Sequence, residues 1–235
     1  MISERTLEVI NLGSVPYLDA WQIQKDTVQR RLVGAVPDTL IFVEHSPTIT
    51  MGRGGPPANL LASQEALNRL GIELVDTDRG GDITYHGPGQ VVGYPILDLS
   101  RPPHKPDLHL YLRLLEETII LALKDLNIET FRMPGLTGVW AEESGGNPAK
   151  IAAIGVKCGQ WITSHGFALN VCPDLAHFDL IVPCGIRDSG VTSAAALTGR
   201  NLEIDMVQAL IARRFAGVFG LELLPVRPRL PAPVS

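Results

Sequence analysis

Residues 150–170, KIAAIGVKCGQWITSHGFALN, predict two successive β-strands in which small residues recur. Side chains alternate between the two faces of a strand. The alternation places Ala153 and Gly155 on one face of the first strand. It places Gly166 and Ala168 on one face of the second strand. If these faces coincide, they leave a groove in which an extended apolar chain can lie. A sheet packed closely by a helix explains the same small residues equally well.

Strands and helices alternate on both sides of this stretch. Further strands are predicted at 6–13, 39–45, 72–77, 91–99 and 138–142. Helices are predicted from Pro16 to Leu32, from Gln64 to Leu70, from Asp107 to Asn127 and from Ile204 to Phe219. Residues 143–148, ESGGNP, are typical of a hairpin connection, which would pair the strands that flank them. The sequence therefore predicts one α/β (α+β) domain over residues 1–224, with a mixed sheet flanked by helices. The Pro-rich residues 225–235 are predicted to form a mobile tail.

Apolar residues at helical spacing predict the inward face of the longer helices. The first helix is expected to have Pro16 at its first helical position. Its inward stripe, which Gln24 interrupts, consists of Tyr17, Ala20, Trp21, Val28 and Leu32. The stripe of the long helix consists of Leu108, Tyr111, Leu115, Ala122 and Leu126. The stripe of the last helix consists of Ile204, Val207, Ile211, Phe215 and Val218.

The composition limits the classes of function. The net charge of −5 leaves no excess of Lys and Arg to neutralise phosphates, so nucleic-acid binding is not expected. An acidic partner would need a local basic patch, whose position the sequence does not give. Apolar runs are far shorter than the roughly 20 residues of a membrane span, so no membrane partner is expected. The hydrophobic fraction of 45% is enough for a well-packed core.

The cysteines and the first residues predict a cytoplasmic protein. The N-terminal residues MISERTLEVI show no basic segment followed by an apolar one, as a secretory signal would. Three cysteines at irregular spacing fit reduced thiols better than a disulfide framework. Cys158 and Cys172 are expected to be buried as small apolar side chains. There is no CxxC or HExxH motif, so no metal site is expected.

A glycine-rich segment at 79–90, RGGDITYHGPGQ, follows one predicted strand and precedes another. Glycines allow the backbone to approach a ligand closely, and Arg79 and His86 can then contact it. The alternative is a hairpin loop whose glycines only satisfy the turn. The segment matches neither GxGxxG nor GxxxxGK, so it does not predict a nucleotide site. His165 could likewise contact a ligand, but the alternative is a structural histidine held by hydrogen bonds, which is the commoner role of a single histidine.

Cys184 and Lys150 are the most informative pair. Cys184 lies between Pro183 and Gly185 in the run IVPCGI, and a turn of this kind favours an exposed sulfur. A thiolate is the nucleophilic form of cysteine. Lys150 can stabilise that thiolate as an ammonium, or can accept the thiol proton as a neutral amine. Either role requires spatial contact, which spacing alone does not establish.

Five motifs in order resemble a known family. These are EHSPTITMGRG, RGGDITYHGPGQVVGYPILDL, KIAAIG, SHGFALN and IVPCGI. Together they are similar to the octanoyltransferases of lipoate biosynthesis, the lipoate–protein ligase B family. The resemblance covers roughly residues 44–198, about two thirds of the chain. It implies a mixed sheet flanked by helices, the fold of the lipoate and biotin ligases.

The resemblance also implies an activity and a site. Such enzymes take an octanoyl (or lipoyl) group from acyl carrier protein as a cysteine thioester. They transfer it to a lysine of lipoyl domains, such as those of 2-oxo acid dehydrogenases or the glycine cleavage H protein. They use no cofactor, and the implied catalytic residues are Cys184 and Lys150. The implied substrate contacts are Arg79, Gly80, Gly81, Asp82, Ile83, Thr84, Tyr85, His86, Ala153, Ile154, Gly155, Gly166, Phe167 and Ala168.

Two other classes of function remain open from the sequence. An ATP-dependent lipoate or biotin ligase has the same fold, but it activates its acid as an adenylate and needs no nucleophilic cysteine. A non-catalytic binder of acyl chains would use the small-residue groove without a covalent step. Cys184 in its Pro/Gly turn favours the transferase over the ligase, and a thioester on Cys184 would distinguish the transferase from the binder.

Overall fold

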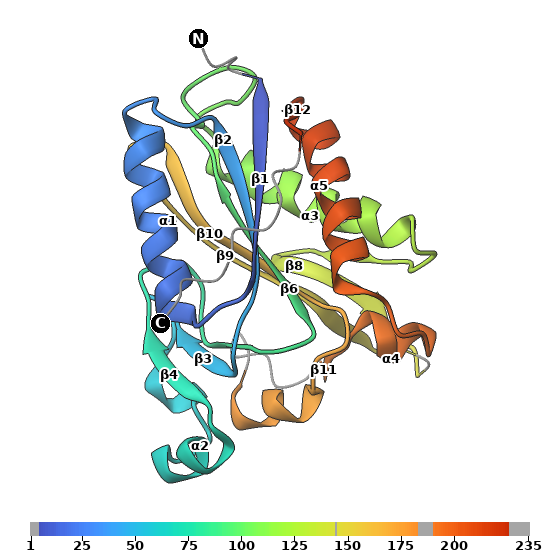
Figure 1. Cartoon of the computed structure of the whole chain (residues 1–235). Coiled ribbons are helices and arrows are strands. Elements are labelled where there is room, and N and C mark those ends of the chain that lie inside the picture. Colours follow the sequence, from blue (N-terminus) through green and yellow to red (C-terminus); the bar gives the residue numbers. More distant parts are fainter. Residues whose placement is uncertain (1–4, 144, 183–189, 226–235) are drawn as a thin grey trace.

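The computed structural model describes residues 5–143, 145–182 and 190–225 (Figure 1). The strands are β1 (Thr6–Ser14), β2 (Asp38–Glu44), β3 (Thr48–Met51), β4 (Glu73–Asp76), β5 (Thr84–His86), β6 (Gln90–Ile96), β7 (Phe131–Met133), β8 (Leu136–Glu142), β9 (Pro148–Gly159), β10 (Ile162–Asn170), β11 (Gly190–Val191) and β12 (Glu222–Leu223). The helices are α1 (Tyr17–Leu32), α2 (Gln64–Leu70), α3 (Leu108–Lys124), α4 (Ala194–Thr198) and α5 (Ile204–Phe219), with short 3-10 helices at Pro57–Asn59 and Leu175–Leu180.

The large sheet is mixed, as the sequence predicts. Within the described residues its strand order is β12-β1-β2-β6-β10-β9-β8-β7, and β11 pairs with β9. β1 runs parallel to β2 and to β12, whereas the strands from β2 to β7 along this order pair antiparallel. The predicted hairpin at 143–148 joins β8 to β9, and Glu142 lies opposite Pro148.

Helices cover both faces of this sheet (Figure 1). α1 packs on one face, where Ala20 contacts side chains of β2, β6 and β10. α3 and α5 pack on the opposite face, over a larger apolar cluster. Leu40 and Phe42 of β2 belong to the cluster under α3 and α5. Ile41 and Val43 belong to the cluster under α1, so β2 is buried on both faces.

A second, small sheet supports the glycine-rich segment. Its order is β4-β3-β5, with β4 parallel and β5 antiparallel to β3. Ile49, Leu67 and Tyr85 belong to its apolar core. Strands β3 and β5, which have four and three residues, were not predicted from the sequence. Strands this short show too few alternations to stand out from a loop.

The predicted helices are present, with corrections at their ends and faces. Pro16 is the N-cap of α1, with ψ 147°, rather than its first helical residue. Leu32 and Leu108 do not belong to the buried stripes, because they lie at helix ends and are exposed at 39% and 36%. Gln24 is fully buried on the inward face of α1. α3 ends at Lys124, three residues before the predicted end at Asn127.

Cys172 corrects another expectation. Cys158 and Cys172 were both predicted to be buried, but Cys172 is exposed and Cys158 is only partly buried. Cys172 follows the end of β10, where its backbone N–H donates to the carbonyl of Gly89. The side chain is therefore on a loop rather than in a core-facing strand position. Of the predicted tail at 225–235, only Pro225 falls among the described residues.

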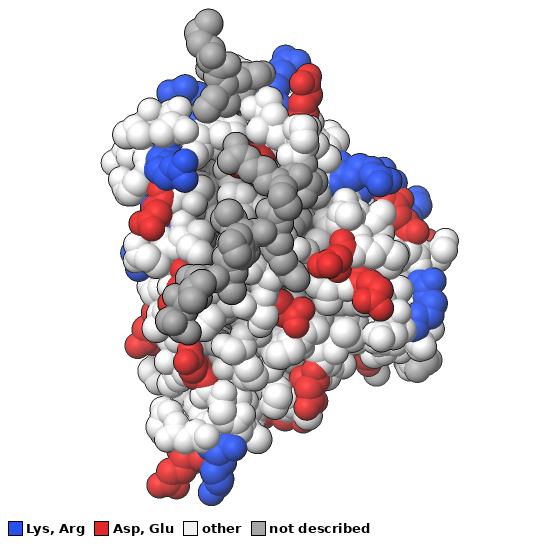
Figure 2. Space-filling model, in the orientation of Figure 1, with Lys and Arg blue, Asp and Glu red and all other residues white. Residues whose placement is uncertain are grey.

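The surface carries both signs of charge. Figure 2 shows acidic and basic side chains interspersed among the described residues of one face. Among the described residues, no helix is long and apolar enough to cross a membrane.

Candidate active site

The register of β9 and β10 brings the small residues of the two strands together. Gly155 lies opposite Gly166, and Ala153 lies opposite Ala168. Directly opposed residues of an antiparallel pair share a face, so the two predicted faces coincide. A methyl group on Gly166 would lie 2.0 Å from the carbonyl oxygen of Gly93, so no larger residue fits there. The strand pair thus presents a face without large side chains toward α1.

The glycine-rich segment lies across this face. The N–H of Gly80 donates to the carbonyl of Val156 at 2.8 Å, which ties the segment to β9. A methyl group on Gly155 would lie 2.9 Å from the carbonyl oxygen of Gly80. Gly81 has φ 85°, a conformation that favours glycine. Close approach of two backbones, rather than a helix packed on the strands, therefore explains why these residues are small.

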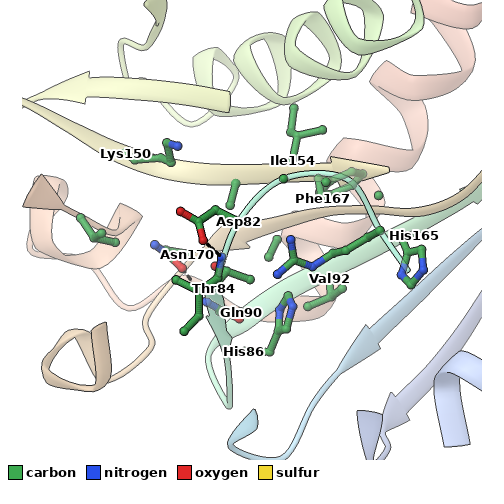
Figure 3. Close-up of a pocket in the computed structure, with 18 of the residues that line it drawn as sticks. Asp82, Thr84, His86, Gln90, Val92, Lys150, Ile154, His165, Phe167 and Asn170 are labelled. Atoms are coloured by element: carbon green, nitrogen blue, oxygen red, sulfur yellow. Dashed lines mark hydrogen bonds between the residues drawn. The ribbon is translucent and has the colours of Figure 1, made fainter. Parts of the chain in front are cut away.

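Between the segment and the strands lies an elongated cleft (Figure 3). Most of the predicted substrate contacts line it, together with Lys150. These are Arg79, Gly81, Asp82, Ile83, Thr84, His86, Ala153, Ile154, Gly155, Gly166, Phe167 and Ala168. Gly80 and Tyr85 lie outside the lining. The hydroxyl of Tyr85 is 2.8 Å from Nδ1 of His177, and its ring packs on Phe178 in the small sheet's core.

Lys150 lies at one end of the cleft because β9 contains a bulge. Val139 of β8 lies opposite Ala152, but the next residue, Trp140, lies opposite Lys150. Ile151 is therefore an extra residue, and it shares the apolar core with Ala152. Strict alternation would give Lys150 the face of Ala152, which is the core face. The bulge turns Lys150 to the cleft face instead, which is a common use of bulges beside active sites.

The side chain of Lys150 is held in a buried site. It is 7% exposed, and its Nζ lies 4.8 Å from the centroid of the Trp140 ring. An aromatic face attracts an ammonium at this distance. Gly138, with φ 127°, adjoins the lysine, since a methyl group there would lie 3.4 Å from Lys150 Cε. A glycine at 138 therefore leaves the space that the lysine stem occupies.

Cys184 lies outside the described residues, within 183–189. The described residues that follow this stretch adjoin Lys150. Val191 of β11 pairs with Lys150 and lines the cleft. The N–H of Thr192 donates to the Lys150 carbonyl at 3.0 Å, and Asn170 donates to the Thr192 carbonyl at the same distance. Residues 190–192 are thus held beside the lysine end of the cleft.

The other end of the cleft is a buried cluster of aromatic and histidine rings. Tyr17 stacks on His86 with ring centroids 5.6 Å apart. His45 contacts Tyr17 and places Nε2 2.6 Å from the hydroxyl of Tyr94. Burial lowers the pKa of His45 to about 4. Burial is also the main reason why the pKa of His86 is well below its usual value, and the nearby His45 and Arg79 lower it further. Burial raises the pKa of Tyr17 to about 12. These rings are therefore neutral near pH 7.

Arg79 crosses this end of the cleft. Its guanidinium donates to the hydroxyl and carbonyl oxygens of Thr50, each at 2.8 Å, which anchors the glycine-rich segment to the small sheet. Asp82 accepts from Asn59 Nδ2 and from its neighbouring N–H of Ile83, both at 2.6 Å. Both charged residues of the motif thus hold the segment in place over the strands.

His165 is a hydrogen-bonded histidine, which was one of the two roles predicted for it. It also lines the cleft. Its Nε2 is 2.7 Å from Asp78, whose other carboxylate oxygen is 2.5 Å from Lys157. Burial lowers the pKa of His165, although the Asp78 hydrogen bond opposes that effect. Partial burial by itself raises the pKa of Asp78, but hydrogen bonds from Lys157 and His165 hold it below its usual value. The Asp78 carboxylate is therefore charged near pH 7.

Several lining residues are absent from the sequence prediction, among them Tyr17, Gln90, Tyr94, Asn170 and Phe178. Tyr17 was assigned to the inward stripe of α1, where its ring is also an apolar packing residue. Gln90 and Asn170 stand inside the quoted motifs, and Gln90 Nε2 donates to Asn170 Oδ1 at 2.8 Å. Within the described residues, no group of three or more His, Cys, Asp or Glu side chains is placed to hold a metal ion.

The family model of the lipoyl protein ligase A/B catalytic domain matches residues 16–216. A bi-partite lipoate protein ligase from Thermoplasma acidophilum has a similar fold, with a TM-score of 0.73 at 16% identity over 93% of this chain and 86% of that chain. A lipoate-protein ligase A bound with ATP gives a TM-score of 0.71 at 16% identity, over 95% of this chain and 90% of that chain. These likenesses confirm the predicted fold.

Closer relatives narrow the class. An octanoyltransferase from Koribacter versatilis is 49% identical over 218 residues, covering 93% of this chain and 86% of the relative. An octanoyltransferase from Rubrobacter xylanophilus is 49% identical over 210 residues, covering 88% and 91%. The chain belongs to the octanoyltransferase family, which consists of acyltransferases that act in protein lipoylation.

Proposed function

We propose that this octanoyltransferase moves an octanoyl (or lipoyl) group from acyl carrier protein, through a thioester on Cys184, to a lysine of a lipoyl domain. The observation that carries the proposal is the position of Lys150. It is buried at one end of an apolar cleft, on the strand that pairs with the residues following the IVPCGI motif. A lysine in that position can serve a thiol that reaches the same end of the cleft.

The acyl chain would lie along the face of β9 and β10. Ala153, Gly155, Gly166 and Ala168 leave room for a straight chain, and Val92 of β6 adds an apolar side chain beside Ala168. Burial of an acyl chain there is favourable by about 0.8 kcal/mol for each methylene removed from water. The glycine-rich segment from Arg79 to His86 would cover the chain from the opposite side.

The first half-reaction exchanges one thioester for another. The Cys184 thiol loses its proton to Lys150, and the thiolate attacks the carbonyl carbon of the donor thioester. The new carbon–sulfur bond to Cys184 forms as the bond to the carrier sulfur breaks. The carrier thiolate leaves with the proton from Lys150. The two thioesters have nearly equal energy, so this step needs no ATP.

The second half-reaction forms an amide. The neutral ε-amine of the acceptor lysine attacks the Cys184 thioester, its carbon–nitrogen bond forms and the bond to sulfur breaks. Lys150 accepts a proton from the attacking nitrogen and returns one to the Cys184 sulfur. Acceptors of this chemistry are lipoyl domains, including those of 2-oxo acid dehydrogenases and the glycine cleavage H protein.

Intact-mass measurement tests the proposal. Wild-type enzyme mixed with octanoyl-acyl carrier protein should gain the mass of one octanoyl group, and Cys184→Ala should gain none. Addition of a lipoyl domain should move that mass onto the domain. Modification of the domain that requires ATP and free octanoate, with no acyl-enzyme, would instead establish a ligase. Lipid that is bound without a covalent bond, and never transferred, would establish an acyl-chain binder.

A further inference from the structure

Beyond the histidine end of the cleft lies a second hollow, between α1 and the β9–β10 strands. Its volume is about 240 Å³, far above the roughly 10–15 Å³ that one water molecule needs on the same measure. Trp21, Lys25 and Val28 of α1 form one wall, and Lys157 and Ser164 belong to the other. No described residue lines both this hollow and the cleft.

The two spaces are nevertheless close neighbours. Ser164 lines the hollow, whereas the next residue, His165, lines the cleft. Asp78 lines the hollow, whereas the next residue, Arg79, lines the cleft. The boundary therefore falls between consecutive residues on both chain segments, and the two spaces are adjacent.

At this boundary lies a hydrogen-bonded chain from His165 to Asp78 to Lys157, here called the partition. Nε2 of His165 is 2.7 Å from Asp78, and Lys157 is 2.5 Å from the second oxygen of Asp78. On the hollow side the His165 ring lies 5.8 Å from the ring of Trp21. The partition thus consists of side chains from β10, from β9 and from the residue before Arg79.

The partition is also incompletely satisfied. Nδ1 of His165 and Nε2 of Gln24 are buried and have no hydrogen-bond partner in the described structure. Oε1 of Gln24 accepts from the backbone N–H of His165 at 2.9 Å, so both groups belong to the same boundary. Unpaired buried polar groups are destabilising and uncommon, so the two groups at this boundary call for an explanation.

We infer that the partition sets the acyl chain length, with His165 as the specificity-determining residue. The inference rests on the proposed transfer of an acyl chain whose tail points away from Lys150. A chain that extends beyond the cleft meets the His165 ring and the Asp78 carboxylate that is hydrogen-bonded to it. Without that ring, a longer chain could pass into the hollow and contact Trp21 and Val28. Longer acyl chains are thus excluded by the polar side chains of the partition.

The test is His165→Gly, because position 165 has φ 55° and glycine adopts that conformation without strain. Octanoyl- and dodecanoyl-acyl carrier proteins are offered as competing donors, and transfer to a lipoyl domain is measured. The ratio of dodecanoyl to octanoyl transfer should rise at least about tenfold, since single methylenes already change such ratios by that order. Gln160→Gly is the matched control, because Gln160 also has positive φ and lines only the hollow. Its ratio should equal that of the wild type.

An active His165→Gly enzyme with the wild-type ratio would overturn the inference and leave the proposed function standing. Failure of the wild-type enzyme to transfer either group would instead refute the proposed function. If the glycine variant does not fold, His165→Asn replaces it, since asparagine tolerates positive φ and is shorter than histidine. If a variant folds but transfers neither group, its affinities for octanoate and dodecanoate are measured by calorimetry. A ratio of the two affinities equal to that of the wild type would then overturn the inference, and a ratio shifted toward dodecanoate would support it.

Discussion

The neutral His45 beneath the cleft should make the fold sensitive to mild acid. Burial lowers the pKa of this imidazole to about 4, against 6.5 in the unfolded chain. The unfolded state therefore binds a proton first as pH falls, and stability that is present above pH 6.5 is lost toward pH 4. The full difference in the free energy of unfolding is about 3 kcal/mol, of which about 2 kcal/mol is lost between pH 7 and pH 5. His86, whose pKa is lowered further, acts in the same direction.

Urea unfolding at a series of pH values measures this effect. The substitution His45→Gln removes the titrating ring and keeps an amide near the Tyr94 hydroxyl, which His45 contacts at 2.6 Å. The variant will be less stable at pH 7, because the hydrogen bond to the Val15 carbonyl is lost. Its loss between pH 7 and pH 5 should be smaller than that of the wild type by about 2 kcal/mol. His109→Gln, at an exposed position, controls for the removal of a histidine.

The quantity that decides the matter is the difference between the two pH dependences. If His45→Gln and the wild type lose the same free energy between pH 7 and pH 5, the ring is not neutral in the folded protein. The reasoning from burial would then be refuted, whatever the absolute stabilities.

Three further results are expected. Cys184→Ala should abolish transfer, whereas Cys172→Ala should keep it because that thiol is exposed; transfer assays on both decide whether the thioester is essential. Lys150→Arg should be nearly as inactive as Lys150→Ala in a pH–rate profile, because arginine keeps the charge but cannot release a proton; a near-normal rate would leave lysine only an electrostatic role. Gly166→Ala should lower the free energy of unfolding by about 3 kcal/mol or more, because its methyl group would lie 2.0 Å from the Gly93 carbonyl; an unchanged urea midpoint would show that β6 can move aside.

Elements with many repeats of one period could be predicted from the sequence. α5 begins at Ile204 and ends at Phe219, as predicted, because its apolar stripe spans four turns and Gly220 follows in a left-handed conformation. The small-residue face of each of β9 and β10 was likewise predicted, because small residues alternate in both strands, but the pairing register was needed to show that the two faces coincide. Short-range patterns are reliable where the same preference is repeated along the element.

Long-range partners account for what the sequence did not reveal. Gln24 interrupts an apolar stripe, yet it is fully buried because its side-chain oxygen accepts from the N–H of His165, 141 positions away. Periodicity contains no information about a partner that distant. The same holds for the cleft itself: the spacing of the motifs does not establish contact between them, whereas the pairing of β11 with β9 places Val191 beside Lys150.

The bulge at Ile151 makes the spacing of the KIAAIG motif as important as its letters. Lys150 and Ala153 face the same cleft although an odd number of steps separates them, which strict alternation forbids. Loss of one residue at 151 would restore the alternation by removing the extra core residue, but it would shorten β9 against β11. Insertion of one residue would send the lysine amine into the apolar core. A change in the length of this strand would therefore alter either the face or the pairing of Lys150, whereas exchange of one apolar residue for another would leave both unchanged.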